Sequence, residues 1–554
     1  MRFLLRTLTL ISFFLACAAN MLAQQSSDAA PNLAIEAIGA KGKAQAPIAP
    51  KQSTEGQSVA DVARQLRGED LAKVRVSPEE AKEILKSVQP VLRFASADSG
   101  LMIHTMVKSR MISRDDLRTM MHVRKIDDDD ARRLQAEELT LKKFGYVPRA
   151  FSTGKFVEGM FEEVLAGFYD PRTKVISLLD WVAPESQLSV LAHELTHALQ
   201  DQNFNLLNWQ ASVPSRHSAR EFQVNEAEAL QEGEARRAVT EGQAMVVLID
   251  YQWKQHGIDS RLELVPGASS SLSSYLAMVP APDTPVIHAA PVFLRDGMGF
   301  AYREGLVFEL ELLGKGGRQL AFSRVFARPP INTHEILHPD AYLQREKIQA
   351  PQIPDLNGAL AEKYEVIDAG GLGELDVRSL VKQFDNSRLA ESISQGWHGS
   401  SYLVVKRKEV PTEKATTADV GLIYVSAWSS RVAAQRFARF YADAVSKRYA
   451  QAVPASAICQ GNGCPLESFQ FNTEEGFVSI ERRPNNLVLV TESFEPNLAV
   501  AVNAAIVKAN ATTRQASRSS PELSSRYLNS PVFADLRALW EERMVLEAVK
   551  AFGK

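Results

Sequence analysis

The hydrophobic positions of this chain follow a helical period over most of its first 350 residues. In the segment 184–202, Leu188, Leu191, Leu195 and Leu199 recur at intervals of three or four, and residues 220–253 repeat the pattern. Such spacing places apolar side chains on one face of an α-helix. We therefore expect two long amphipathic helices here, after mainly helical structure up to about residue 143.

Shorter apolar runs indicate strands. Two of them flank a Pro-containing turn within residues 168–179 and predict a β-hairpin just before the first helix. Residues 264–300 are rich in Pro, Ser and Gly and predict a loop. Beyond a change in composition near residue 350, we expect strands at 401–406, 420–426, 476–482 and 486–491, and helices at 429–449 and from 497 onward. The fold class is therefore α+β, with a mainly helical part followed by a smaller α+β domain.

The first residues predict export. A short basic start with Arg2 and Arg6 precedes an uncharged run from Leu8 to Ala19, which is short for a bilayer span and typical of a secretory signal peptide. Cys17 lies in an imperfect match to a bacterial lipoprotein box, so a lipid anchor there is an alternative. We expect a secreted, periplasmic or other cell-envelope protein, divided into a signal peptide (1–23), a disordered spacer (24–63), a main domain (64–350), an accessory α+β domain (351–510) and a helical tail (511–554).

Charge and cysteine content narrow the class further. The chain has 63 Lys and Arg against 66 Asp and Glu, a formal net charge of −3, which argues against a nucleic-acid partner. Cys459 and Cys464 flank a Gly-containing turn and could form a small-loop disulfide in an oxidising compartment, two free thiols being the alternative. The oligomeric state is not predicted.

The segment His193-Glu194-Leu195-Thr196-His197 falls within the first long helix. Residues four apart lie on one face of a helix, so His193 and His197 can reach a single metal ion. Zinc binds neutral imidazole well, and a catalytic zinc site has three protein ligands and one position open to water. In such a site Glu194 is the expected general base.

A second segment, His334-Glu335-Ile336-Leu337-His338, has the same spacing. It lies between Pro329-Pro330 and Pro339, and a residue before proline is pushed out of the helical region. At best, Thr333 caps a single helical turn. We therefore assign the metal site to the first segment and interpret the second as accidental.

A third ligand is required. Where one zincin variant has Gly and a third His, this chain has Gln200 and Asn203, which excludes that variant. A carboxylate from the helix at 220–253 is the alternative. Glu234 and Glu241, seven residues apart, fall on the apolar side of that helix.

Of these two residues we favour Glu241, because Gly242 beside it would let a neighbouring backbone approach closely. A carboxylate on a buried face needs a cation or several hydrogen-bond donors. The alternative role for Glu241 is an ion pair with Arg236 or Arg237.

Residues 193–202 (HELTHALQDQ), 166–171 (AGFYDP) and 241–244 (EGQA) resemble a group of secreted bacterial and archaeal zinc metallopeptidases of the gluzincin type, in which two His and one Glu bind zinc. The resemblance spans roughly residues 140–345 and implies a zincin-like catalytic domain with zinc on His193, His197 and a Glu that matches Glu241. Members of this group also carry a stretch similar to residues 329–339, in which His334 here replaces the usual Glu.

In the thermolysin-like pattern an acidic residue stands four positions after the ligand Glu. This chain departs from that pattern, because Met245 occupies the corresponding position. The residue that orients a zinc histidine is therefore expected elsewhere, at Asp201 or Glu163.

The remaining parts of the site are less constrained by sequence. An oxyanion needs a hydrogen-bond donor, and His338, Tyr342, Tyr302 and Tyr169 are suitable, with His338 placed first. The hairpin at 168–179 is the expected edge for an extended substrate.

Together these features predict a zinc-dependent peptidase that hydrolyses peptide or protein substrates through a metal-activated water. A zinc amidase acting on cell-wall peptides is one alternative, and a non-catalytic zincin-like protein of envelope binding or assembly is another. The intact Glu194 favours an enzyme, because a non-catalytic copy has no chemical need for the base.

Overall fold

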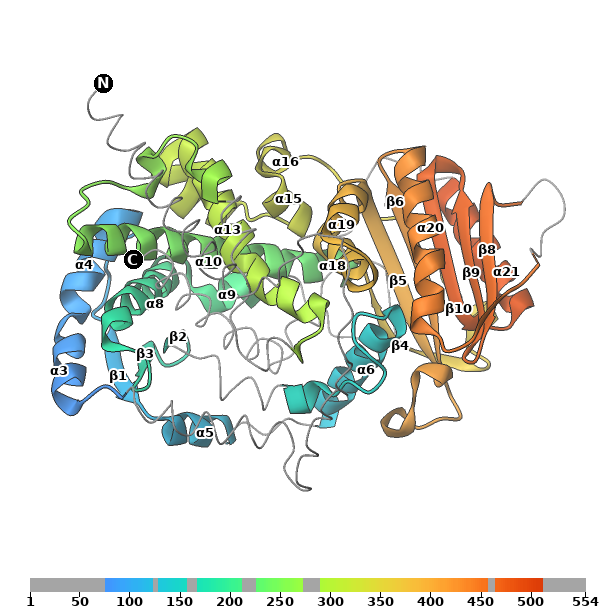
Figure 1. Cartoon of the computed structure of the whole chain (residues 1–554), viewed down its shortest axis with the longest axis horizontal. Helices are drawn as coiled ribbons and strands as arrows, with labels where there is room; N and C mark the ends of the chain where they lie inside the picture. The colour runs from blue at the N-terminus through green and yellow to red at the C-terminus, as the bar shows by residue number, and fades with distance from the viewer. Residues whose placement is uncertain are drawn as a thin grey trace, which may run out of the picture. The chain divides into compact units, whose positions relative to one another are not determined.

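A computed structural model describes residues 75–122, 128–156, 167–211, 226–272, 289–456 and 464–511. They belong to one compact unit that begins at Val74. The predicted signal peptide and spacer, Cys17, Cys459 and residues 512–554 lie outside the described ranges, and the expected domain boundaries stay predictions. The described residues form an α+β fold with one three-stranded and one seven-stranded sheet (Figure 1).

The predicted hairpin is confirmed as β2 (Gly167–Asp170) and β3 (Val175–Leu179), which pair antiparallel. A third strand, β1 (Lys108–Ile112), pairs parallel to β3, so that the order is β1-β3-β2 and β2 is an edge strand. The expectation of mainly helical structure up to about residue 143 holds for α3 to α6 but did not include β1. Its side chains alternate between more and less exposed, as the period of a strand requires.

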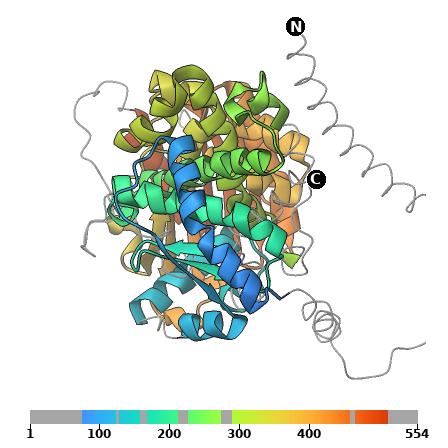
Figure 2. The ribbon, with the colours of Figure 1, turned by 90° about the vertical axis from the view of Figure 1, so that its left-hand side faces the viewer.

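Helices α3 (Pro78–Lys86) and α8 (Pro184–Phe204) contact this small sheet. The other helices of the first part are α4 (Val88–Ser99), α5 (Arg114–His122), α6 (Asp128–Phe144), α9 (Leu206–Ala211), α10 (Glu226–Gln255) and α13 (Val292–Gln319). In Figure 2, α4 (blue) lies across the green helices, in agreement with its contacts to α8 and α10. The two long helices that the apolar pattern predicts are thus α8 and, over its described part, α10.

The helix α13 corrects the predicted loop at 264–300, because the structure is helical from Val292 onward. Glycines lower the helix propensity of this segment, but one of them, Gly305, is needed where α13 packs against α10. A Cβ on Gly305 of α13 would lie 2.3 Å from the Ala238 carbonyl oxygen of α10. A Cβ on Gly242 of α10 would likewise lie 2.3 Å from the Gly305 carbonyl oxygen. The close backbone approach predicted at Gly242 is confirmed.

Five short helices follow: α14 (Val325–Ala327), α15 (Thr333–Leu337), α16 (Pro339–Gln344), α17 (Asn357–Leu360) and, after the first strand of the large sheet, α19 (Ser387–Ser394). The single turn expected at the second His segment is α15. Its cap is Asn332 rather than Thr333, since the Asn332 side chain accepts a hydrogen bond from the Glu335 amide.

The large sheet is antiparallel throughout, in the order β4-β5-β6-β10-β9-β8-β7. Its strands are β4 (Tyr364–Gly370), β5 (Trp397–Arg407), β6 (Val420–Trp428), β7 (Ala452–Pro454), β8 (Glu467–Thr473), β9 (Gly476–Arg483) and β10 (Leu487–Phe494). The four predicted strands correspond to β5, β6, β9 and β10. The pattern did not predict β4, β7 or β8.

Helices cover both faces of this sheet. Leu422 and Tyr424 of β6 face the core shared with α18 (Glu374–Phe384), α19 and α20 (Arg431–Arg448), whereas Ile423 and Val425 face the core shared with α17 and α21 (Pro496–Ala511). Phe144, at the end of α6, also packs in the first of these cores. The helices expected at 429–449 and from 497 are confirmed as α20 and α21.

Two findings bear on the expected compartment. Cys464 is disulfide-bonded. Within the described ranges, each helix is too short or too polar to cross a membrane.

Candidate metal centre

The helix α8 carries the first His segment through the interior of the molecule. Proline at its first position and a left-handed Asn205 after its end mark its limits. His193 and Glu194 are buried, with 1% and 4% of their surface exposed, among Leu191, Ala192 and Leu195. Side chains in so apolar a setting need specific polar partners.

Those partners come from α10. The Nε2 atoms of His193 and His197 lie 3.0 Å apart, and Glu241 Oε2 lies 3.2 Å from the first and 3.4 Å from the second. Zinc ligands at about 2.0–2.1 Å in a tetrahedron lie about 3.3–3.4 Å from one another. The three donor atoms, two nitrogens and one oxygen at 3.0–3.4 Å from one another, come close to this spacing and could hold a metal ion.

The structure also separates the two sequence candidates for the third ligand. Glu234 pairs with Arg237 at 3.2 Å, and Arg236 pairs with Glu232. Glu241 instead faces the two histidines. Its position, and not that of Glu234, fits the predicted ligand.

Without a metal ion, charge interactions within this group are strong. Burial alone would raise the pKa of Glu241, but His197 and His193 outweigh it and hold that pKa well below its usual range. Burial alone would lower the pKa of His197, but the Glu241 carboxylate raises it to about 10. One carboxylate between two imidazoles thus favours a positive charge at this point, the place a metal cation would take.

Glu194 is held beside the group by the small sheet. Its Oε2 accepts a hydrogen bond of 2.8 Å from the backbone amide of Tyr169 on β2. Burial raises the pKa of Glu194; the neighbouring histidines lower it, and Glu241 raises it further. The net shift is upward, in the direction that suits a group that accepts a proton near neutral pH.

Gln200 contacts His197 directly, and Gln243 holds Gln200 in place. The sequence analysis did not assign a role to either glutamine. His197 Nδ1 lies 2.8 Å from Gln200 Oε1, while Gln200 Nε2 donates to the Thr240 carbonyl and to Gln243 Oε1. Because the amide oxygen only accepts, Nδ1 is the donor in this contact, and Nε2 is the nitrogen that faces Glu241 and His193. Gln243 in turn donates to the Ala321 carbonyl.

The predicted orienting residue Asp201 has other contacts. Its carboxylate accepts from the Tyr169 hydroxyl at 2.7 Å, from Lys174 and from the Leu206 amide. Glu163, the other expected candidate, lies outside the described residues. The signal that could have pointed to Gln200 is its place three residues after His197, on the same helix face.

The structure does not bring His338 to this centre. Its Nε2 contacts Glu374 instead, at 3.0 Å, so the prediction of an oxyanion donor at His338 is not supported by its contacts. The Tyr342 hydroxyl donates a hydrogen bond to the Arg328 backbone carbonyl, and the Tyr169 hydroxyl donates one to the Asp201 carboxylate.

Tyr302 fits the site better than the other three candidates. Its ring is stacked on that of His193, with centroids 6.3 Å apart. Its hydroxyl is buried and has no hydrogen-bond partner among the described residues.

Comparisons with family models, with curated proteins and with solved structures found no match to this chain. The metal centre therefore stands on its own geometry.

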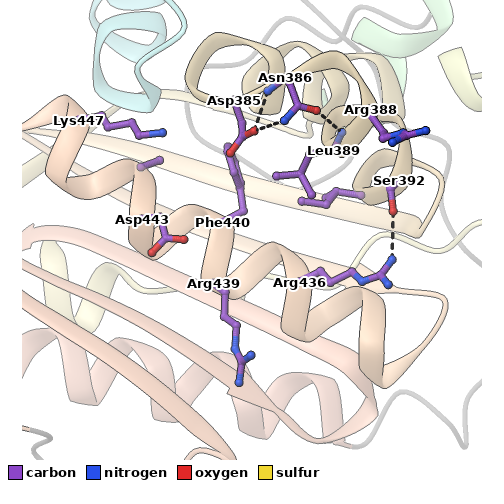
Figure 3. A pocket seen from close by; sticks show the side chains of 12 residues that line it. Asp385, Asn386, Arg388, Leu389, Ser392, Arg436, Arg439, Phe440, Asp443 and Lys447 are labelled. Carbon is purple, nitrogen blue, oxygen red and sulfur yellow. Dashed lines mark hydrogen bonds between the residues drawn. The ribbon is translucent and has the colours of Figure 1, made fainter.

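A surface pocket elsewhere does not belong to this centre. It lies between α19 and α20, with Asp385, Arg388 and Asp443 in its lining (Figure 3). Two of its basic residues have contacts outside the lining, because Arg439 binds Glu467 and Lys447 donates to the Phe384 carbonyl. None of the predicted site residues lines this pocket.

Proposed function

We propose that this protein is a zinc-dependent peptidase with a zincin-like catalytic part of the gluzincin type, in which His193, His197 and Glu241 bind the metal. The observation that carries the proposal is the mutual spacing of their three donor atoms, 3.0–3.4 Å, with Glu194 fixed beside them. An ion pair alone does not require two imidazoles, a carboxylate and an adjacent buried base in one place.

Zinc in such a site supplies a Lewis acid that makes water nucleophilic near neutral pH and polarises a carbonyl group. Glu194 is the general base. The Tyr169 amide holds one of its carboxylate oxygens, which leaves the other to take the proton from water and pass it to the leaving amine. Tyr302, whose ring stacks on His193 and whose hydroxyl has no hydrogen-bond partner among the described residues, is the candidate donor to the developing oxyanion.

An extended peptide is the substrate class that best fits the surroundings. The strand β2 is an edge of the small sheet, and its Tyr169 amide points to Glu194 rather than to β3. A substrate added as a further strand along this edge would lie beside the base. This placement favours hydrolysis of a peptide bond within an extended segment.

Export from the cytoplasm agrees with two features of the chain. The first residues have the basic and apolar pattern of a secretory signal peptide. The disulfide at Cys464 is of a kind that persists in oxidising compartments. We infer a secreted or cell-envelope protein.

The decisive experiment measures zinc content and hydrolysis in the same preparations. Wild-type protein should cleave a mixed peptide library and lose this activity with a chelator. Glu194→Gln should retain zinc but lower kcat by at least about 100-fold, because a general base contributes about 10²- to 10⁴-fold. Cleavage products also separate the peptidase from an amidase specific for cell-wall peptides.

The matched control is Glu83→Gln, which changes an exposed glutamate on α3 and should leave both properties unchanged. Full hydrolysis by the Glu194→Gln protein would refute the mechanism. Zinc bound without any hydrolysis by the wild type would instead favour the non-catalytic alternative.

A further inference from the structure

We propose that His334, His338 and Glu374 form a second metal site, which binds a zinc-like divalent cation and links α15 to α18. This site shares no residue with the first group. The inference goes beyond the proposed peptidase activity and does not depend on it. It departs from the expectation that the second His segment is accidental.

The short helix α15 positions both histidines. The Asn332 cap and Pro339 limit it to one turn, and the His338 amide donates to the His334 carbonyl at 2.8 Å. The hydrogen bond across four residues places the two rings on the same side, with centroids 4.4 Å apart. The single turn of α15 is therefore enough to bring the rings of His334 and His338 together on one side.

Glu374, the first residue of α18, completes the group. Its Oε2 lies 2.6 Å from His334 Nδ1 and 3.0 Å from His338 Nε2. One donor atom from each of the three residues lies within 4.8 Å of the others. Two imidazole nitrogens and one carboxylate oxygen are the same donor set as in the first group, and they suit zinc.

Burial makes a cation favourable here. The Glu374 side chain is 3% exposed, and within the described ranges its carboxylate is contacted only by the two imidazoles. A buried carboxylate needs a cation or several donors, and a divalent cation bound by all three groups would compensate its charge. The His338 side chain is 38% exposed, so solvent can reach one side of the site.

Two further groups lie near His334. Its Nδ1 faces Glu374, and its other nitrogen, Nε2, lies 3.9 Å from Glu346 Oε2, which is an ion-pair distance and too long for a hydrogen bond. The ring of Trp397 lies on another side of His334, with centroids 6.1 Å apart.

Glu335 occupies the position that Glu194 has in its segment. Its Oε2 accepts a hydrogen bond of 2.8 Å from the Ile331 amide, and its own amide is bound to the Asn332 cap. We assign this metal a structural role because it would join α15 to α18.

The location explains what such a metal would stabilise. Leu375, next to Glu374, packs in the core of the helical part, whereas Val377 and Leu380 of the same helix pack in the core of the large sheet. Helix α18 is also bound to α13 through Arg378–Glu304 and Lys382–Asp296 ion pairs. A metal at Glu374 would fasten α15 to the element that joins the two cores.

The test counts zinc per chain in the purified, full mature protein by elemental analysis. We expect two equivalents in the wild type, one in His338→Ala, one in His197→Ala and none in the double variant. Glu374→Gln keeps hydrogen bonding to the histidines while removing the charge, and it should also bind one equivalent. His256→Ala, which changes a histidine of neither group, should bind two.

A cobalt titration followed by visible absorption gives an independent readout, because His197→Ala protein should still show a saturable one-equivalent cobalt spectrum. Chelation should lower the melting temperature of His197→Ala but not of the double variant. If His338→Ala and Glu374→Gln fold and still bind two equivalents, the second site is refuted while the first stands. If His197→Ala alone retains two, the first assignment fails while the second is unaffected.

Discussion

At the scale of single residues, Glu194 and Glu335 hold the same place in their segments but differ in their contacts. The Tyr169 amide of a neighbouring strand holds Glu194 beside the histidines, whereas Glu335 bonds to the backbone of its own loop. Glu194 lies in a helix of 21 residues, and Glu335 in one of five. The sequence pattern alone therefore indicates two histidines on one side of a helix, but not the direction of the carboxylate between them.

The orientation of His197 leads to a prediction at this scale. Gln200→Ala removes the acceptor that fixes the Nδ1 proton, and we expect the zinc dissociation constant of the first site to rise about 10- to 100-fold. Competition with a chromophoric chelator measures it. Gln202→Ala is the control on the same helix, because Gln202 bonds to the backbone at His104 and Thr105. Equal affinities for the Gln200 and Gln202 variants would contradict the role of the glutamine.

At the scale of elements, the crossing of α10 and α13 positions the third ligand. Gly242 and Gly305 let the two helix backbones touch, and Gly242 is the immediate neighbour of Glu241. Overpacking in such a place costs about 1–3 kcal/mol and moves backbone. The distance between these helices thus contributes directly to the geometry of the metal centre.

Gly242→Ala should therefore lower the free energy of unfolding by at least about 1–3 kcal/mol and weaken zinc binding at the first site. Urea denaturation and chelator competition measure the two effects. Gly233→Ala is the matched control, because nothing lies within 4 Å of its added Cβ on the same helix. That variant should be neutral or gain up to about 1 kcal/mol. Similar behaviour of both variants would refute the importance of the crossing.

Some helices and strands were predicted from the apolar pattern of the sequence, and others were not. The helices α8 and α20 and the strands β5, β6, β9 and β10 follow their predicted ranges, because apolar periodicity and local propensity agree there. Helix α13 was missed because its glycines resemble loop residues, although one of them is needed at the crossing. Strand β1 was missed because its five residues are stabilised only by pairing with β3, far along the chain.

At the scale of the whole molecule, buried charges join helices that are distant in sequence. Arg318 of α13 lies 3.4 Å from both Asp98 of α4 and Asp250 of α10. Burial and the neighbouring Asp98 raise the pKa of Asp250 to about 8, and burial also raises the pKa of Asp98. Arg318 and Arg261 together face three carboxylates, those of Asp98, Asp250 and Glu263, so the folded protein retains a proton there.

This proton makes stability depend on pH. An unfolded aspartate has a pKa of about 3.9, so the folded pKa of Asp250 is raised. The stabilisation from the bound proton is complete below about pH 4 and is lost as the pH rises towards 8. We expect the free energy of unfolding of the wild type, relative to Asp250→Asn, to fall between pH 5 and pH 8. Urea denaturation with chelator present measures this, so that metal loss does not contribute.

Asp259→Asn serves as the comparison, because Asp259 is exposed and lies just beyond the same helix. Its difference from the wild type should not change with pH. A constant difference for Asp250→Asn as well would show that no proton is retained at the buried pair.

The sequence by itself determined the two long helices and the hairpin before them, and it singled out His193, His197 and Glu194 as candidate ligands and base, because each depends on spacing within one helix or one turn. It narrowed the third ligand to Glu234 or Glu241 by placing both on an apolar face. Only the tertiary structure favoured Glu241 over Glu234, because Glu234 forms an ion pair with Arg237 whereas Glu241 lies beside the two histidines. Only the tertiary structure brought Glu374 to His334 and His338, because residues from separate elements meet through packing, which no local pattern records.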